Sequence, residues 1–447
     1  MQRNPIVLIH GYSDDAGAFK GWQQILERRG YDVAMVNACT YRSLTNEVTI
    51  KDIAEGFDRA LKTQTGLADD EPFDAIVHST GMLVIRAWLT AYSGRRERLK
   101  HLVGLAPATF GSPLAHKGRS WLGALFKGNR HLGPDFLEAG DKVLDGLELA
   151  SRFSWDLAHL DLLGDETFYG PTRRTPYVFI FCGNESYSGL RQLVDNEPGS
   201  DGTVRWAGCP LNTRKIIFDL THDASEKRIS VADWKNTDIP LILVDGKNHG
   251  TILSEPGDEL AELVDSALKV STGPAFAQWI DTATKRTQPA RAKIDEWQQF
   301  VVRVVDERGD PVPDYNIQLI RRGSLVDTSS QGIHEFDVDV HTYKDDPSLR
   351  CFHVRLADLD YAKLPSLWVR LIASSGSQLV GYHGFGSEKT PDAPNAREGK
   401  WDGSLDISSL ADDTGIKFFY PFTTTLIELR LNREPLPLTG KNEVCWF

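Results

Sequence analysis

Residues 73–89 read FDAIVHSTGMLVIRAWL, and this stretch decides the fold of the chain. Its first part, residues 73–77, is a short apolar run of the kind that forms a buried strand. From Leu83 onwards, apolar residues recur at the three- and four-residue spacing of a helix with one buried face. The sequence therefore predicts a strand, a sharp turn at residues 78–81 and a helix, with Ser79 in the turn.

A serine in such a turn has the position of a nucleophile. The turn pushes the side chain out from the end of the sheet, as in the nucleophile elbow of serine hydrolases. The N-terminus of the following helix offers free N–H groups and a positive dipole end to a developing oxyanion. The usual motif is G-x-S-x-G, and here Val77 takes the place of the first glycine. The simpler alternative is an ordinary strand-turn-helix with a surface serine.

Strands and helices alternate on both sides of this stretch. The other runs typical of buried parallel strands lie at residues 4–9, 31–37, 101–106, 175–182 and 239–245, and helical spacing occurs at 19–29 and 46–65. This alternation predicts an α/β fold, a doubly wound and mostly parallel sheet with helices on both faces. Ligands of such sheets bind at the carboxyl ends of the strands. We therefore expect His10-Gly11-Tyr12, Ser79 and Ala106-Pro107 to share one crevice.

A catalytic serine needs a base to remove its proton and an acid to orient the base. In hydrolases built on such sheets, the three follow in the order Ser, Asp or Glu, His. Asp201 lies in the tight turn Ser-Asp-Gly-Thr-Val, and His249 follows the last apolar run. We predict Ser79, Asp201 and His249 as the catalytic residues. The competing candidates for the base and the acid are His222, Asp195 and Asp219.

An oxyanion hole needs two backbone N–H groups that face the carbonyl oxygen of the substrate. Thr80, directly after the serine, is expected to supply one of them, and Tyr12 the other. The residues expected to support these two loops are His10, Gly11, His78 and Gly81.

Residues 107–170 interrupt the alternation and are rich in helical patterns. One interpretation is a helical insertion that packs its own small core. The other is a cap or lid at about residues 111–170, whose apolar face covers the crevice and admits acyl chains. The two interpretations are compatible. The candidate pocket residues on this insertion are Trp121, Leu122, Leu125 and Phe126.

The pattern changes after a polar stretch at residues 281–293, which we interpret as a linker. Beyond it, short and partly alternating apolar runs are separated by turn signals, and this predicts an antiparallel β-sandwich. We therefore expect a catalytic domain at residues 1–285 and an accessory domain at residues 294–447. The accessory domain is expected to bind a lipid surface, a carbohydrate or a partner protein.

The composition of the chain limits the partners, the cellular location and the cofactors that we expect. The chain has 447 residues and a net charge of −12, so it has no overall attraction to nucleic acid or anionic membranes. No signal peptide is visible and no apolar run reaches ~18 residues, so we expect no membrane span and a protein that is cytoplasmic, or exported by another route. The five cysteines lack metal-ligand spacing and are expected to be mostly reduced, although export would leave a Cys182–Cys209 bridge open. Metal and nucleotide motifs are absent, so no metal and no cofactor are expected.

Five segments together resemble bacterial lipases and lecithin:cholesterol acyltransferase-like esterases of the α/β-hydrolase superfamily. They are PIVLIHGY at 5–12, IVHSTG at 76–81, APATFGSP at 106–113, SDGTV at 200–204 and NHG at 248–250. The resemblance covers roughly residues 1–270 and implies hydrolysis of carboxylic esters with a lipid-like acyl group.

The chain departs from the pattern of these families at Val77 and at Met82, which replaces a second glycine often found after the elbow. Three alternatives therefore stay open. The first two are a phospholipase and an acyltransferase that use the same three residues. The third is a binding protein that keeps the fold without catalysis, and Val77 is the residue that favours it.

Overall fold

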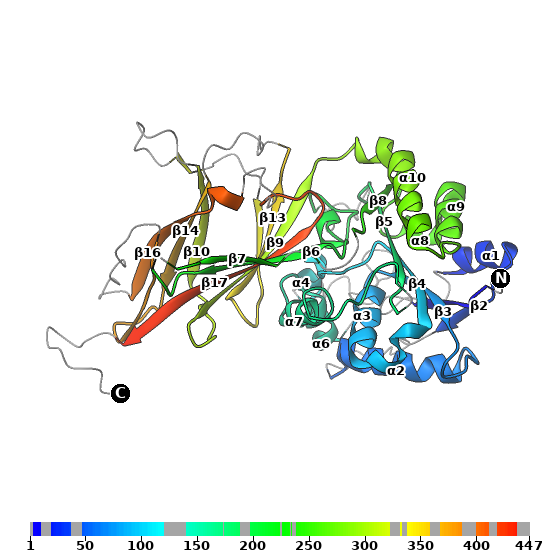
Figure 1. Cartoon of the computed structure of the whole chain (residues 1–447), viewed down its shortest axis with the longest axis horizontal. Helices are drawn as coiled ribbons and strands as arrows, with labels where there is room; N and C mark the ends of the chain where they lie inside the picture. The colour runs from blue at the N-terminus through cyan, green and yellow to red at the C-terminus, as the bar shows by residue number, and fades with distance from the viewer. Residues whose placement is uncertain are drawn as a thin grey trace. The chain divides into compact units, whose positions relative to one another are not determined.

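The computed structural model describes residues 3–9, 19–36, 47–119, 140–172, 174–187, 197–223, 226–232, 234, 238–321, 331–332, 338–357, 367–386, 399–410 and 418–435. The chain forms two compact units (Figure 1). The first unit comprises Met1–Thr213, Trp234–Asp295 and Phe422–Thr424. The second comprises Arg214–Asp233, Glu296–Pro421 and Thr425–Phe447. Both units are therefore built from separate pieces of chain, whereas the sequence had suggested two continuous segments.

The first unit is built on a six-stranded sheet in the order β2-β1-β3-β4-β5-β8. All five neighbouring pairs are parallel. Such a sheet is covered on both faces, so its strands are continuous apolar runs. The strands are β1 (Ile6–Ile9), β2 (Val33–Val36), β3 (Phe73–His78), β4 (Leu99–Leu105), β5 (Tyr177–Gly183) and β8 (Leu241–Val244). The doubly wound parallel sheet predicted from the alternation is confirmed.

Helices cover both faces of this sheet. In Figure 1, α2 (Ile50–Thr63) and α3 (Gly81–Ala91) lie on one side, and α1 (Lys20–Arg28), α9 (Gly257–Ala267) and α10 (Gly273–Arg291) lie on the other. This division is what right-handed crossovers between parallel strands produce. The short helix α8 (Thr251–Ser254) joins the second group, where its Ile252 carbonyl accepts a hydrogen bond of 3.2 Å from the Trp22 indole of α1.

Helix α10 corrects one prediction from the sequence. Residues 281–293 are not a linker, because the helix continues to Arg291. Its buried face is formed by Phe276, Trp279, Ala283, Thr287 and Ala290, which recur every three or four positions. The second half of this face consists of small or polar residues, so hydrophobic periodicity did not reveal it.

Among the helices in the described part of the chain, none has the length and the apolar character that a membrane span requires.

Within the described residues between β4 and β5, where the sequence predicted a helical insertion, the structure has three helices. They are α4 (Pro113–Arg119), α6 (Asp141–Leu147) and α7 (Arg152–Asp161). Residues 120–139 fall outside the described residues, and with them the candidate pocket residues Trp121, Leu122, Leu125 and Phe126. The role of the insertion as a lid therefore stays a prediction.

A buried ion pair attaches the insertion to α3. The Arg86 guanidinium of α3 donates to both carboxylate oxygens of Asp161 in α7, at 2.7 and 2.9 Å, and to the Thr109 carbonyl at 2.6 Å. The Tyr169 hydroxyl donates to the same Asp161 carboxylate at 2.6 Å. Both charged side chains are fully buried. This pairing satisfies charges that would otherwise be costly inside the protein.

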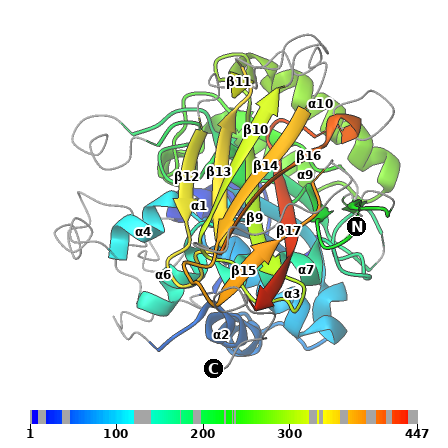
Figure 2. The ribbon, with the colours of Figure 1, turned by 90° about the vertical axis from the view of Figure 1, so that its left-hand side faces the viewer.

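The second unit contains two sheets whose buried residues form one core. The first has the order β11-β10-β14-β16 (Figure 2). The second has the order β12-β13-β9-β17-β6-β7, with β15 paired to β17. The strands are β6 (Thr213–Asp219), β7 (Ile229–Ala232), β9 (Trp297–Asp306), β10 (Tyr315–Arg321), β11 (Gln331–Gly332), β12 (Val338–Thr342), β13 (Leu349–Arg355), β14 (Leu367–Ser374), β15 (Val380–His383), β16 (Lys400–Asp406) and β17 (Thr424–Pro435). In β14, buried and half-buried residues alternate, as expected for a strand with one face on a core. The predicted C-terminal antiparallel β domain is confirmed.

Strands β6 and β7 come from the middle of the first unit's sequence. They form an antiparallel pair that belongs to a sheet of the second unit. The sequence showed an apolar run at residues 215–220 but gave no sheet for it, because β17, its neighbour on the side away from β7, lies far away in the chain.

Candidate active site

The predicted nucleophile lies in a strained turn. Ser79 directly follows β3 and has a φ of 52°, in the left-handed region that residues other than glycine seldom occupy. Neighbouring backbone holds this conformation, because Ser79 N–H donates to the Leu105 carbonyl and its own carbonyl accepts from Met82 and Ala108 N–H groups. Such strain costs on the order of 1–3 kcal/mol and is typical of functional turns. The turn thus has the backbone of a nucleophile elbow despite the incomplete motif.

Gly104 lies beside both residues that depart from the motif and offers room for one of them, Met82. Val77 is fully buried in β3 and pairs with Gly104 of β4. A Cβ atom at position 104 would lie 2.9 Å from the terminal methyl of Met82 and 3.1 Å from Ile180 Cδ1. The absence of a side chain at Gly104 therefore leaves space for Met82, one of the two departures from the motif.

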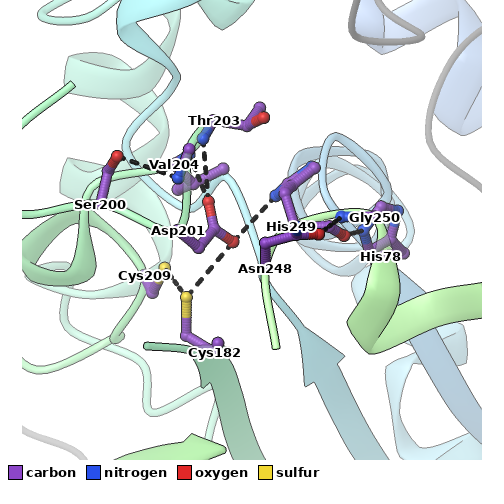
Figure 3. Close-up of polar contacts among 12 residues, drawn as sticks. His78, Cys182, Ser200, Asp201, Thr203, Val204, Cys209, Asn248, His249 and Gly250 are labelled. Carbon is purple, nitrogen blue, oxygen red and sulfur yellow. Dashed lines mark hydrogen bonds and ion pairs between the residues drawn. The ribbon is translucent and has the colours of Figure 1, made fainter. Parts of the chain in front are cut away.

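Asp201 and His249, the predicted acid and base, are in direct contact. His249 Nδ1 donates to Asp201 Oδ2 at 3.0 Å, and the His249 backbone N–H donates to the Asp201 carbonyl at 3.1 Å (Figure 3). The other carboxylate oxygen, Oδ1, accepts from the N–H groups of Thr203 at 3.0 Å and Val204 at 2.8 Å. Asp201 is completely buried and His249 is 5% exposed. The carboxylate therefore fixes both the tautomer and the position of the imidazole.

His78 connects the serine turn to the histidine loop. Its Nε2 donates to the His249 carbonyl at 3.0 Å, and the two rings are 4.6 Å apart. His78 precedes Ser79 in the chain, so this contact brings the nucleophile turn beside His249. Among the described residues, Ser79 Oγ has no hydrogen bond to His249. In enzymes without substrate this contact is often long and tightens when the substrate binds.

The structure describes one of the two residues expected to form the oxyanion hole. Thr80 precedes α3, is 1% exposed, and its N–H has no backbone acceptor within the described part of the chain. Gly81, the first residue of α3, is buried beside it. Tyr12 and its supporting neighbours His10 and Gly11 lie outside the described residues. Thr80 and Tyr12 as the two oxyanion donors both stay predictions.

The competing residues lie elsewhere. His222 belongs to the second unit, and its side chain is 54% exposed and within 3.8 Å of Glu226. Asp219 belongs to the second unit as well, and Asp195 lies outside the described residues.

The thiols of Cys182 and Cys209 lie close to Asp201, and the sequence did not predict them as part of the site. Cys182, near the end of β5, has its Sγ 3.4 Å from Asp201 Oδ2 and 3.8 Å from Cys209 Sγ. Both are free thiols, and burial raises their pKa. The position of Cys182 at the carboxyl end of a core strand was the available signal in the sequence, since ligands and catalytic groups gather at that edge.

Comparisons with known proteins agree with the fold. No protein-family model matches the sequence, and no curated protein is detectably similar to it. Phospholipase PlaB from Legionella pneumophila, solved alone and in complex with thio-NAD, is similar with a TM-score of 0.76 and 20% identity, and the match covers 99% of this chain and 98% of PlaB.

Two further structures show a more limited likeness. The mature lipase BlEst2 from Bacillus licheniformis has a TM-score of 0.37 and 17% identity, with 57% of this chain and 88% of BlEst2 covered. The metagenomic carboxyl esterase MGS0156 has a TM-score of 0.36 and 17% identity, with 63% and 76% covered. By its sheet topology and the full-length match, the chain has an α/β-hydrolase fold and a second, mostly C-terminal β unit.

Proposed function

We propose that this protein is a serine hydrolase that cleaves carboxylic esters of lipid-like substrates. The observation that carries the proposal is the buried Asp201–His249 pair, held by His78 beside the strained turn of Ser79. Acid, base and nucleophile come from three strand ends of one sheet edge, which is where such folds bind their ligands.

The reaction would proceed through an acyl-enzyme. Ser79 Oγ attacks the ester carbonyl carbon while His249 Nε2 takes its proton, and the Asp201 carboxylate stabilises the imidazolium. The resulting oxyanion accepts hydrogen bonds from the N–H groups of Thr80 and Tyr12. When the intermediate collapses, the carbon–oxygen bond to the alcohol breaks and His249 protonates the leaving oxygen. Water then attacks the acyl group in the same manner and releases the acid and free Ser79.

The triad is tested with a fluorophosphonate probe and peptide mapping by mass spectrometry. We expect the adduct on Ser79 in the wild type and loss of both labelling and ester hydrolysis in Ser79→Ala. Ser374→Ala, on β14 of the second unit, serves as the control and should behave like the wild type. Labelling at another residue, or hydrolysis that persists in Ser79→Ala, would refute the assignment.

Phospholipids are the second candidate substrate, because a solved protein that is similar along the full length, PlaB, is a phospholipase. Phosphatidylcholine vesicles and a triacylglycerol emulsion, each with and without an added alcohol, separate the alternatives. Free fatty acid from the vesicles supports a phospholipase, and acyl transfer to the alcohol supports an acyltransferase. If short p-nitrophenyl esters and both lipids give no product above the Ser79→Ala background, a non-catalytic binding protein is the better interpretation.

A further inference from the structure

The buried carboxylate of Asp201 has a neighbour that the mechanism above does not use. Cys182 Sγ lies 3.4 Å from Oδ2, the same oxygen that accepts the His249 Nδ1–H. Asp201 and Cys182 are both completely buried. Figure 3 shows the carboxylate between the thiol on one side and the imidazole on the other.

The thiol carries its proton at neutral pH. Burial, together with its neighbours Cys209 and Asp201, raises the pKa of Cys182 well above the ordinary value for cysteine. A protonated thiol is a donor, although a weak one, and an ionised carboxylate is a better acceptor than the sulfur of Cys209. Cys209 has an acceptor of its own in the Arg205 carbonyl at 3.4 Å.

The hydrogen bonds of Asp201 leave one place for this donor. An ionised carboxylate has about four acceptor positions. Thr203 and Val204 N–H groups take those of Oδ1, and His249 takes one of Oδ2. The S–H of Cys182 completes the set, as expected for a buried charge, which is costly unless fully hydrogen-bonded.

We propose that Cys182 is a positioning residue for Asp201, whose S–H donates to Oδ2 and limits the negative charge that this oxygen presents to His249. The proposal rests on the proposed function for its catalytic meaning, but the hydrogen bond itself can be tested without catalysis. Groups that donate to an ionised carboxylate reduce its basicity. With the thiol removed, Oδ2 should attract the imidazolium more strongly, and the pKa of His249 should rise.

A role in packing alone predicts a different result. If Cys182 only filled space, its removal would loosen Asp201, weaken the contact with His249, and lower the pKa of the imidazole or leave it unchanged. The other titratable groups around the pair are His78, Cys209, Tyr187 and the ion pair of Arg205 with Glu197. They are the same in all the variants compared below, apart from the Cys209 control.

The experiment follows the pH titration of the His249 ring by NMR, with the signal assigned by its absence in His249→Gln. In Cys182→Ala we expect the midpoint to rise by about half a pH unit, the size of one weak neutral hydrogen bond. Cys182→Ser, which restores a donor, should return towards the wild type. Cys182→Val, which fills the space without a donor, should rise like alanine and replaces it if the alanine variant does not fold. Cys209→Ala, equally buried but without contact to Asp201, is the matched control and should not shift.

The pH dependence of kcat/KM for a p-nitrophenyl ester gives the second readout. We expect its acid limb to move up by the same amount in Cys182→Ala, with KM unchanged. A midpoint that stays or falls in the alanine and valine variants, or a serine variant that does not recover, overturns the proposal. If the NMR shift occurs in a protein that hydrolyses no ester, the proposed function fails and the hydrogen bond stands. If hydrolysis depends on Ser79 and no shift occurs, only the role of Cys182 fails.

Discussion

At the scale of single residues, the space around the turn of Ser79 depends partly on a residue that lies outside the local motif. The usual elbow motif, G-x-S-x-G, has a glycine two positions before and two positions after its serine. Here Gly81 keeps the second glycine, Val77 replaces the first, and Met82 follows. Val77 and Met82 are both completely buried, and Gly104 on the neighbouring strand leaves space for the Met82 side chain.

Gly104→Ala should therefore disturb the elbow. The new methyl would lie 2.9 Å from Met82 Cε and 3.2 Å from Pro107 Cγ, closer than side chains normally approach. We expect a stability loss of about 1–3 kcal/mol from overpacking, with slower fluorophosphonate labelling of Ser79. The measurements are thermal unfolding and the labelling rate.

The double variant Gly104→Ala with Met82→Ala is the control, because it removes the methyl that the new Cβ would meet. It should recover part of both losses. A single variant with wild-type stability and labelling rate would show that Gly104 does not provide the space.

A second residue-scale feature makes stability depend on pH. His101 of β4 forms an ion pair of 2.7 Å with Asp74 of β3 and donates through Nε2 to the Val270 carbonyl at 2.6 Å. Burial lowers the pKa of His101, but the hydrogen bond and the charge of Asp74 raise it more, so the pKa lies above its ordinary value.

Because the folded pKa is raised, the stabilisation is fully present below the unfolded value of about 6.5 and is lost as pH rises through the folded pKa. We expect the urea midpoint to fall over this interval in the wild type and to fall less in Asp74→Asn. Equal slopes in the two proteins would contradict the prediction.

At the scale of elements, helix α3 links the nucleophile to the insertion. It begins directly after Thr80, and its Arg86 holds Asp161 at the end of α7. The insertion is thus attached to the same helix that follows the proposed nucleophile, Ser79.

Arg86→Met leaves Asp161 without its cationic partner in a completely buried position. We expect a loss of about 3–5 kcal/mol, because an unpaired buried charge is much less stable than the pair. Hydrogen exchange measured by mass spectrometry should show reduced protection of residues 152–161. Arg86→Met combined with Asp161→Leu removes both charges and should regain much of the protection. Unchanged exchange in the single variant would argue against this attachment.

The sequence predicted most of these elements from their apolar patterns, and it missed those features that have no such pattern. Buried parallel strands are continuous apolar runs, and Asp201 and His249 follow such strands in readable turns. Helix α10 was missed because alanine and threonine form half of its buried face. Cys182 could not be assigned, because its contact with Asp201 depends on a distance across the fold.

At the scale of the whole molecule, the chain leaves the first unit at Arg214 and returns at Trp234. In this excursion, Ile216, Phe218 and Leu220 are buried in the core of the second unit. A protein that ends at residue 295 would lack β9, β17 and all other strands of that core after β7. Its residues 214–233 would then present unpaired strand edges and apolar side chains to solvent.

We expect the 1–295 truncation to be aggregated. Replacing residues 214–233 of this truncation with a short Gly-Ser linker should improve its solubility, which size-exclusion chromatography would measure. A soluble, monomeric 1–295 protein would contradict the expectation.

The position of residues 214–233 in the second unit also affects the protein during its synthesis. Strand β6 leaves the ribosome before β17, its neighbour in the sheet, which follows about 200 residues later. At ordinary rates of synthesis this interval lasts on the order of 10–40 s. During that time the nascent chain carries an apolar strand with an open edge, a template for pairing with other chains. Protection of the growing chain, and not only the stability of the finished one, should therefore determine how much active protein a cell obtains.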